Sequence, residues 1–346
     1  MSPLAKRRWN QFRENRRAYN ALWIFLTLFT LSLFAEFIAN DKPIFVYHQD
    51  ELFVPVLFDY SEEDLGGELS SAANFWDPTV KEWIENSGGW ILWAPVPYHF
   101  RTPDMYLNGP APTAPDSIHW LGTDDAGKDT FARLIYGFRL SVLFGITLTI
   151  ISASIGVIVG GLQGYFGGMV DLIGQRFVEI WTGLPILIIL IILASIVEPS
   201  FFWLLGCLAA FSWMSIVGVV RAEFLRTRNF EYVRAATALG DTHLSIMIRH
   251  VLPNAMTAAL TFLPFILSGA ITSLTALDFL GFGLPAGSAS LGELLNQGKR
   301  NLQAPWLGLT GFVTVGVMLT LLIFVGEGIR DAFDPRKTIS ASGDRS

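Results

Sequence analysis

The chain has 346 residues, of which 51% are hydrophobic and only 16% are charged, and its formal net charge at pH 7 is −6. This composition is typical of proteins that span a membrane and excludes most soluble enzymes. The single cysteine, Cys207, excludes an intrachain disulfide, and the five histidines show no spacing that suits a metal ion, so we expect no metal site.

The N-terminal segment is basic and leads into a first apolar run. It carries six basic residues, Lys6, Arg7, Arg8, Arg13, Arg16 and Arg17. Residues 22–38 are apolar and about long enough to cross a membrane. No small-x-small cleavage site follows, which favours a retained span over a signal peptide. We expect a cytoplasmic tail over 1–21 and a first transmembrane helix over 22–38, because basic residues stay on the cytoplasmic side.

Residues 39–119 are too acidic to lie in a membrane. They hold thirteen acidic residues against three basic ones, Lys42, Lys81 and Arg101. An acidic segment that follows a cytoplasmic tail and a span predicts a periplasmic insert between the first and second spans. Four tryptophans supply material for a small core or for contact with the membrane interface: Trp76, Trp83, Trp90 and Trp93.

The segment Gly122–Asp129 nearly matches the phosphate-binding pattern G-x-x-x-x-G-K-[ST]. Asp129 stands where that pattern needs a hydroxyl, and Asp124 and Asp125 place negative charge where phosphates would bind. We therefore expect no nucleotide site here. The residues that follow predict a capped amphipathic helix at the membrane interface, with Phe131, Leu134 and Ile135 on one side.

Five further apolar stretches predict transmembrane helices at about 140–162, 180–197, 201–220, 255–277 and 306–325. Glycines recur every four residues from the second span onward and share one helix face, which favours close helix contact: Gly156, Gly160, Gly164 and Gly168. Gly183 and Pro185 predict a bend in the third span. A short amphipathic helix is expected over Leu291–Leu302, between the last two spans.

The fifth span carries a stripe of polar or kinking residues on one helix face: Thr257, Thr261, Pro264, Ser268, Thr272 and Thr275. One interpretation is a face that lines a hydrophilic path for substrate. The other is helix packing, in which each hydroxyl bonds to its own backbone.

The loop 221–253 between the fourth and fifth spans is cytoplasmic by its charge, since it holds five arginines: Arg221, Arg226, Arg228, Arg234 and Arg249. Its second part predicts two short helices. Val233, Ala236 and Leu239 give the first a small apolar face. Gly240 can end that helix in the left-handed conformation, and Asp241 or Thr242 can cap the next.

The second short helix is predicted from apolar residues at helical spacing, Leu244, Met247, Ile248 and Val251, and we expect it to stop at Pro253. The run of small side chains before Gly240, namely Ala235, Ala236 and Ala238, allows another surface to come close. A hairpin of short helices that is small on one side and apolar on the other suits insertion into a cleft of a partner.

The pattern Ala235-Ala236-x-x-x-Gly240, nine residues, x-x-Leu252-Pro253 resembles the EAA loop of ABC importer permeases, although Arg234 stands where that family usually has glutamate. Two further segments, Trp120–Val142 and Gly326–Arg336, resemble oligopeptide and dipeptide permeases. In the first, the matching positions are Gly122, Thr123, Asp124, Gly127, Lys128, Asp129, Arg133, Gly137 and Arg139. With its basic tail and acidic insert, the chain resembles most the inner-membrane permease of the microcin C and oligopeptide importer of Gram-negative bacteria.

The resemblance implies an all-α polytopic membrane protein with six transmembrane helices of the type I ABC importer permease fold. The permease core is expected over 120–336 and a cytoplasmic tail over 337–346, with both termini in the cytoplasm and the chain in the bacterial inner membrane. The implied function is that of a permease subunit in an ATP-driven importer for peptides or peptide-like compounds. Such a subunit forms half of an alternating-access pathway and is not itself an enzyme.

The partners that the resemblance implies are a second permease of similar fold, two ATPase modules and a periplasmic binding protein, with no nucleic acid. No cofactor is expected, because the ATPase subunits bind the ATP. The acidic insert is either a docking platform for the binding protein or an insertion that packs on its own protein. The coupling residues implied are Tyr232, Arg234, Ala235, Ala236, Gly240, His250, Leu252 and Pro253.

Two other functions fit the sequence less well. An ion-coupled secondary transporter needs ionisable residues within its spans, whereas Glu36, Glu179 and Asp278 lie near the predicted ends. An intramembrane hydrolase needs a nucleophile and a base inside the membrane, and no histidine lies in a predicted span.

Overall fold

The computed structural model describes residues 3–107, 109–285 and 287–333, so the predicted tail at 337–346 lies outside the described residues. Contacts divide the chain into two compact units. The first contains Met1–Thr27, Ser141–Pro285 and Val315–Ser346, and the second contains Leu28–Leu140 and Ala286–Thr314. Three helices run from one unit into the other: α2 (Arg16–Leu33), α5 (Thr130–Phe166) and α14 (Pro305–Phe333).

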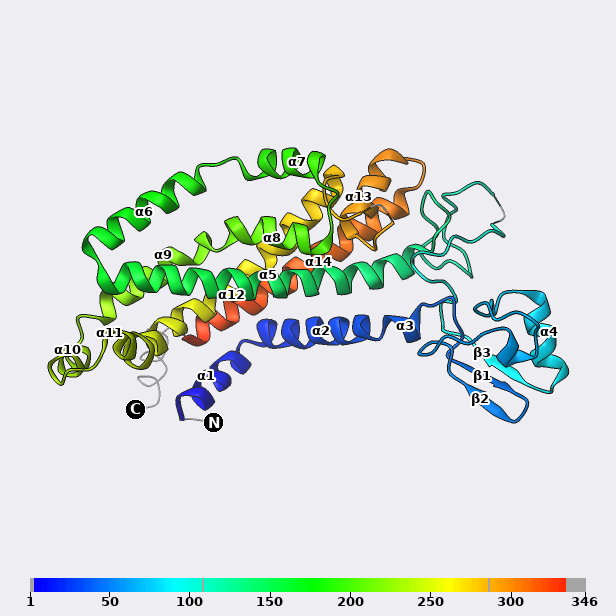
Figure 1. Ribbon diagram of the computed structural model, residues 1–346, viewed down its shortest axis with the longest axis horizontal. Coiled ribbons are helices and arrows are strands. Elements are labelled where there is room, and N and C mark those ends of the chain that lie inside the picture. Colours follow the sequence, from blue (N-terminus) through cyan, green and yellow to red (C-terminus); the bar gives the residue numbers. More distant parts are fainter. Residues whose placement is uncertain (1–2, 108, 286, 334–346) are drawn as a thin grey trace. The chain divides into compact units, whose positions relative to one another are not determined.

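The first unit is helical throughout its described residues (Figure 1). Besides those three helices it contains α1 (Pro3–Glu14), α6 (Gly168–Thr182), α7 (Ile186–Ile196), α8 (Phe201–Ser212), α9 (Met214–Thr227), α10 (Glu231–Ala238), α11 (His243–Ser245), a π-helical turn (Ile246–Val251) and α12 (Leu252–Leu280). One core of this unit lies where α9, α10, the π-helical turn and α12 meet.

Four described helices are long and apolar enough to cross a membrane: 130–166, 201–227, 243–280 and 305–333. The bent pair α6 and α7 is a fifth candidate. These five cover the second to sixth spans expected from the sequence. The expected first span corresponds to α2 and α3 (Ala35–Ile38). It is not among the candidates, and the polar first turn of α2 with Arg16 and Arg17 lowers the hydropathy of that helix.

Two span boundaries differ from the prediction. Helix α5 begins at Thr130 and runs without a break for 37 residues, so the amphipathic helix predicted around Phe131–Ile135 and the second span form one helix. Those residues form the first turns of the same helix, because nothing in the sequence from Thr130 to Leu140 interrupts it. The third span begins at Gly168 rather than near 180.

The bend predicted in the third span is confirmed. Helices α6 and α7 meet at 68° across the short break 183–185 (Figure 1). Pro185 has no backbone N–H to donate and its ring excludes the preceding helical carbonyl, so the helix ends and restarts at this point.

The predicted close contact through glycines is confirmed for the three that lie in α5. A Cβ atom on Gly156 would stand 2.6 Å from the carbonyl oxygen of Trp213. The same atom on Gly160 would stand 2.7 Å from that of Val217, and on Gly164 2.5 Å from that of Arg221. Successive glycines of α5 therefore contact successive turns of the backbone of α9 and its N-cap residue. Gly168 starts α6 and faces open space, so it takes no part in this contact.

The second unit contains a small three-stranded antiparallel sheet, which the all-α prediction did not include. The strands β1 (Phe45–His48), β2 (Glu51–Phe53) and β3 (Trp90–Leu92) lie in the order β2-β1-β3. Each strand has only three or four residues, which is too few for a clear alternating pattern in the sequence. The remaining elements are a 3₁₀ turn (Glu63–Leu65), α4 (Pro78–Asn86) and α13 (Leu291–Arg300).

The sheet and α4 enclose a core of their own, formed by Val46, Leu65, Phe75, Val80 and Ile84. Trp83 and Trp93 pack against this core, whereas Trp90 is half-exposed, so the tryptophans only partly fulfil the role expected of them. The amphipathic helix predicted over 291–302 is confirmed as α13 and ends two residues earlier.

Candidate coupling loop

The loop between the fourth and fifth spans is anchored where it leaves α9. The Arg228 guanidinium donates to the carbonyl oxygens of Gly164 at 3.2 Å and Tyr165 at 3.0 Å. These carbonyls belong to the last turn of α5, where helix geometry leaves them without a partner. The Tyr165 hydroxyl also lies 2.9 Å from His243 Nδ1, so the end of α5 holds both α9 and α11.

Helix α10 ends as predicted at Gly240, in a Schellman motif. Gly240 has φ +86°, its N–H donates to Thr237, and the N–H of Asp241 donates to Ala236. This pair of bonds satisfies two carbonyls at the helix end and requires a left-handed residue. Thr242 then caps the next helix, since its hydroxyl accepts the N–H of Ser245 at 3.3 Å. Of the two caps that the sequence allowed, Thr242 is the one that forms.

The second short helix does not stop at Pro253. It passes through the π-helical turn into α12, so residues 243–280 form one helix. Pro253 cannot donate a backbone hydrogen bond, and its ring would clash with the carbonyl four residues earlier in a regular α-helix. The preceding turn is wider, and the N–H of Leu252 donates to Met247, five residues back.

The π-helical turn changes which apolar residues are buried. Ile246 and Val251, five positions apart, are fully buried, whereas Leu244 is 67% exposed and Ile248 is 53% exposed. The predicted apolar face at α-helical spacing is therefore wrong at Leu244 and Ile248. The sequence gives no local signal for a π turn, and a 3.6-residue period assigns the face incorrectly.

The core of the loop joins it to the two neighbouring spans. Val233 and Ala236 of α10 pack with Ile246 and Val251. The same cluster includes Ile216, Val220 and Phe224 of α9, and Ala255 and Ala259 of α12. The loop is thus packed as a continuation of these helices.

A short polar network closes the open side of the hairpin. Asn254 Nδ2 donates to the Tyr232 hydroxyl at 2.6 Å, and that hydroxyl donates to the carbonyl of His250 at 3.4 Å. His250 Nε2 lies 3.5 Å from Asp241 Oδ2. The structure therefore brings together Tyr232 and His250, two of the residues predicted to take part in coupling. Asn254 was not predicted, since an asparagine after Leu-Pro carries no pattern of its own.

The predicted coupling residues divide by exposure. Arg234, Ala235, Gly240 and Pro253 are exposed, as is Tyr232, while His250 and Leu252 are partly buried. Ala236 is buried in the core of the loop, which corrects the expectation that it contacts a partner directly. Leu239 is 88% exposed, so it does not share the buried face of Val233 and Ala236. It caps α10 and lies in the turn rather than on the helix.

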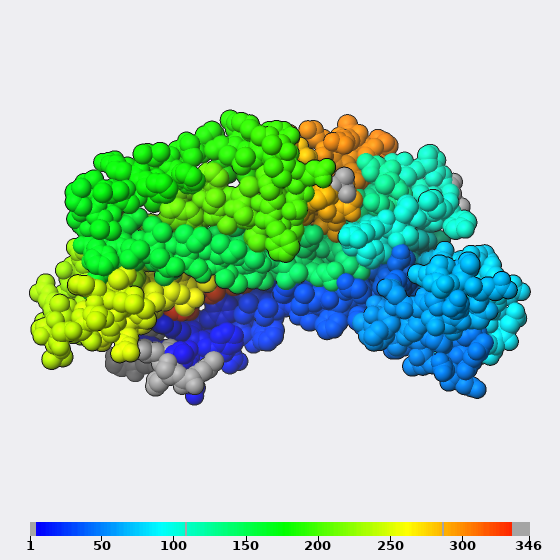
Figure 2. Space-filling view, viewed as in Figure 1, coloured from blue at the N-terminus to red at the C-terminus, as the bar shows by residue number. Residues whose placement is uncertain are grey.

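Several large apolar side chains of the loop are exposed, and the loop lies at one end of the first unit (yellow in Figure 2). We call this the loop surface and define it by its exposed apolar side chains, Phe230, Tyr232, Leu239, Leu244 and Ile248. Monomeric proteins seldom leave apolar side chains clustered in water, and such clusters mark interaction sites. The loop surface can therefore bind a partner.

Comparison with known proteins places the chain in a family. The family described as "Binding-protein-dependent transport system inner membrane component" matches residues 129–339, which is more than half of the chain. The chain belongs to this family. A second family, "N-terminal TM domain of oligopeptide transport permease C", matches residues 2–70. The family resemblance found in the sequence is thus confirmed.

Individual relatives agree with this assignment. The chain is 58% identical over 339 residues to the "Inner membrane ABC transporter permease protein YejE" of Escherichia coli, covering 98% of this chain and 99% of the relative. It is 56% identical over 361 residues to the "Peptidoglycan transport system permease protein YejE" of Agrobacterium fabrum, covering 97% and 94%. It is 36% identical over 225 residues to the "Dipeptide transport system permease protein DppC" of Bacillus subtilis, covering 64% and 70%.

The polar stripe of α12 fits the packing interpretation, in which each hydroxyl bonds to the backbone of its own helix. The five hydroxyls of the stripe donate to backbone carbonyls three or four residues earlier: Thr257, Thr261, Ser268, Thr272 and Thr275. Pro264 and Thr275 are buried, whereas Thr272 is exposed. Because an exposed hydroxyl is still available to a substrate, the pathway interpretation also stands.

The segment Gly122–Asp129, which nearly matches the phosphate-binding pattern, binds the carboxylate of its own Asp124. Asp124 Oδ1 accepts the backbone N–H groups of Ala126 and Lys128, both at 2.8 Å. The other oxygen of Asp124 pairs with Arg133, which also donates to Glu293 at 2.8 Å. The amides that a phosphate would use are thus occupied by a buried side chain. Asp124 and Arg133, two positions of the family resemblance, hold the loop to α5 and α13.

His119 ties the same loop to the preceding segment. Its Nδ1 lies 2.8 Å from Asp129 and its Nε2 3.1 Å from Asp104. Burial alone would lower the pKa of His119, but the hydrogen bonds with Asp129 and Asp104 outweigh it and raise the pKa above its ordinary value of 6.5. The two carboxylates thus favour the protonated imidazole ring, and its two hydrogen bonds crosslink the loop to the preceding segment.

Proposed function

We propose that this chain is the transmembrane permease subunit of an ATP-driven importer for peptides or peptide-like compounds. It forms half of the translocation pathway beside a second permease of similar fold. Two separate ATPase modules supply the energy and dock on the loop surface, and a periplasmic binding protein delivers the substrate. The observation that carries this proposal is the loop surface, a set of exposed apolar side chains on a hairpin that packs directly against α9 and α12.

Peptidic cargo is supported by the names of two relatives, a dipeptide transport permease of Bacillus subtilis and a peptidoglycan transport permease of Agrobacterium fabrum. Microcin C, a member of the same chemical class, is a further cargo that the resemblance implies. We further propose six spans, with α2 and α3 as the first. Both termini and the loop 221–253 then face the cytoplasm, and the acidic insert 39–119 faces the periplasm. This orientation follows from the basic residues on one side and the acidic residues on the other.

Uptake of labelled peptides into proteoliposomes that contain this chain with its co-purified subunits is expected to require ATP. Uptake should persist when ionophores collapse the ion gradients, because the energy comes from the ATPase subunits. The measurement is initial uptake rate with and without ATP, and with and without ionophore. Loss of uptake on adding ionophore at constant ATP would contradict the proposal and favour the ion-coupled secondary transporter.

The same assay separates the two interpretations of the stripe. If the stripe lines the path, Thr261→Trp and Ser268→Trp should lower the uptake rate at least tenfold while the subunits still co-purify. Phe262→Trp, on a different and exposed face of α12, is the matched control and should transport normally. Equal loss of assembly in all three variants would favour packing alone.

The orientation is tested with single cysteines in a Cys207→Ser background. Ser70 lies in the acidic insert and Ala238 in the loop, and both are exposed. Ala238 is preferred to Thr242, whose hydroxyl caps α11. An impermeant thiol reagent added to intact spheroplasts is expected to label Ser70→Cys and to miss Ala238→Cys until the membrane is opened. The reverse labelling would overturn the proposed orientation.

A further inference from the structure

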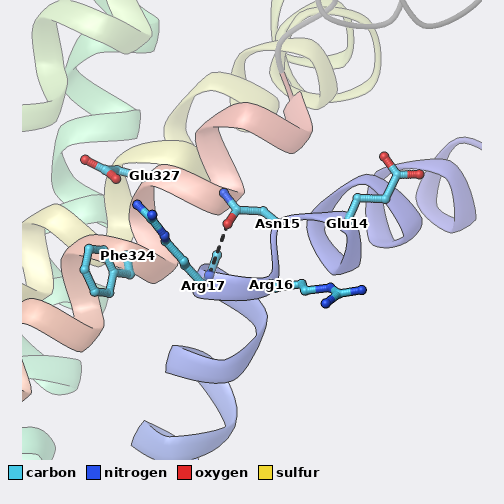
Figure 3. Close-up of a pocket in the computed structure, with 7 residues that line it drawn as sticks. Glu14, Asn15, Arg16, Arg17, Phe324 and Glu327 are labelled. Carbon is cyan, nitrogen blue, oxygen red and sulfur yellow. Dashed lines mark hydrogen bonds between the residues drawn. The ribbon is translucent and has the colours of Figure 1, made fainter.

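The first two helices meet in a sharp elbow at Asn15. Helix α1 ends at Glu14 and α2 begins at Arg16. The Asn15 side chain accepts the N–H of Ala18 at 3.2 Å, and its carbonyl accepts the N–H of Tyr19 at 3.0 Å (Figure 3). A residue that caps the following helix in this way sets the direction in which that helix restarts. The elbow is therefore a defined structure.

The elbow is seated on the last turns of α14. Phe12 and Ala18 form a buried cluster with Ala332. A Cβ atom on Gly328 would stand 2.2 Å from that of Ala18, so the backbone of α14 approaches the elbow closely. Arg8 stacks its guanidinium 4.3 Å from the ring centre of Phe333. Because α14 is a candidate membrane span, this contact places the elbow where that span ends.

A polar cavity of about 450 Å³ opens at the elbow (Figure 3). It is lined by Glu14, Asn15, Arg16, Arg17, Ala18, Phe324 and Glu327. Arg16 and Arg17 are exposed, and none of the ion pairs within the described residues includes either of them. Over α1 and the first turn of α2, six basic residues stand against one acid, Glu14. Two guanidinium groups and two carboxylates thus line the cavity beside a basic segment, and the Arg16 and Arg17 side chains point in different directions (Figure 3).

An apolar cavity of about 320 Å³ is lined by the same three helices, α1, α2 and α14. Its walls include Trp9, Phe12, Leu22, Ile329 and Phe333. Trp9 is 40% exposed and Trp23 is 50% exposed, as expected of aromatic side chains at a membrane interface. The elbow therefore offers charged groups and apolar surface together, the combination with which amphipathic segments bind lipid.

We propose that the α1–α2 elbow binds an anionic phospholipid, with its headgroup on Arg16 and Arg17. Arginine side chains suit a phosphodiester, since each guanidinium can donate two parallel hydrogen bonds to its oxygens. Glu14 and Glu327 in the same cavity disfavour a doubly charged free phosphate, but they can accept hydrogen bonds from a hydroxylated headgroup. A glycerol headgroup on a singly charged phosphodiester, as in phosphatidylglycerol, matches this set of groups. The apolar cavity takes part of an acyl chain.

The test compares lipid retention by the full-length chain and its variants in detergent. Each protein is equilibrated with equal amounts of phosphatidylglycerol and phosphatidylcholine that carry identical acyl chains, and the bound lipids are counted by native mass spectrometry. The wild-type protein is expected to retain phosphatidylglycerol in preference. The variant Arg16→Gln/Arg17→Gln should lose roughly 30-fold of that preference, the product of two basic residues at an anionic surface.

Two controls keep this test decisive. Arg16→Lys/Arg17→Lys keeps both positive charges and should retain most of the lipid preference. It therefore controls for a folding defect in the glutamine variant. Lys299→Gln/Arg300→Gln removes two charges at the end of α13 and should change nothing. Equal retention of the two lipids by the wild-type protein, or displacement of the lipid by inorganic phosphate, would overturn the proposal. So would an unchanged lipid preference with loss of a co-purifying protein, which would identify the elbow as a protein-binding surface.

Discussion

Changing Leu239 and Leu244 to aspartate is expected to abolish import and to release the ATPase subunits, while the chain still accumulates in the membrane. The two leucines are 88% and 67% exposed, so their replacement removes little packing within the loop. Burying each one against a partner contributes about 1.5–3 kcal/mol. Losing both, and placing two carboxylates in an apolar contact, should weaken co-purification of the ATPase more than a hundredfold.

The measurement is peptide uptake together with ATPase co-purification, each normalised to the amount of this chain. Leu302→Asp is the matched control, because Leu302 is 82% exposed and lies after α13, outside the loop. It should transport normally. Import at the wild-type rate in the Leu239→Asp/Leu244→Asp variant would show that the loop surface is not the coupling site.

Gly240→Val probes the same loop through its backbone. No atom lies within 4 Å of the Cβ position, so the substitution creates no clash, but φ at +86° disfavours a β-branched residue by roughly 1–2 kcal/mol. The effect should therefore be partial, and weaker than that of the leucine pair. Ala236→Asp is less informative, because it buries a carboxylate in the core of the loop and would disturb the hairpin whether or not a partner binds.

Replacing Gly160 by leucine is expected to prevent stable folding of the first unit. A Cβ atom at this position would stand 2.7 Å from the Val217 carbonyl, and a leucine adds three further carbon atoms. Helices α5 and α9 would have to separate along their contact, at a cost of about 3 kcal/mol or more. That is a large share of the stability of a typical domain.

Thermal unfolding of the detergent-solubilised chain measures this effect, together with its level in the membrane. Gly218→Leu is the matched control, because Gly218 is exposed on α9 and faces open space at its Cβ position. It should unfold at the wild-type temperature or higher, since leucine favours a helix over glycine. A Gly160→Leu protein as stable as Gly218→Leu would contradict the close packing of these helices.

The features that follow from composition and local chemistry could be predicted from the sequence. Long apolar runs predicted five of the spans, and the spacing of Gly156, Gly160 and Gly164 predicted a close helix contact, although not that α9 is the partner. Gly240 and Thr242 were predicted because a left-handed turn and a helix cap each favour a few residue types. In these cases one residue or a few neighbouring residues are enough to predict the structural feature.

The features that depend on distant contacts could not be predicted in this way. Whether Leu239 is buried depends on where α10 ends relative to α9 and α12, and the turn after α10 leaves it exposed. The π-helical turn before Pro253 is stabilised by the burial of Ile246 and Val251 against those same helices. The strands of the insert are too short to show a period, and only their pairing in three dimensions reveals the sheet.

The unbroken helix from His243 to Leu280 has a mechanical consequence for the chain. Its 38 residues correspond to a rod of roughly 57 Å at 1.5 Å per residue. If this helix turned as one body about its loop end, a tilt of about 5° would displace the other end by roughly 5 Å. Under the proposed coupling, a small movement of a partner bound to the loop surface would therefore be enlarged at the far end of α12.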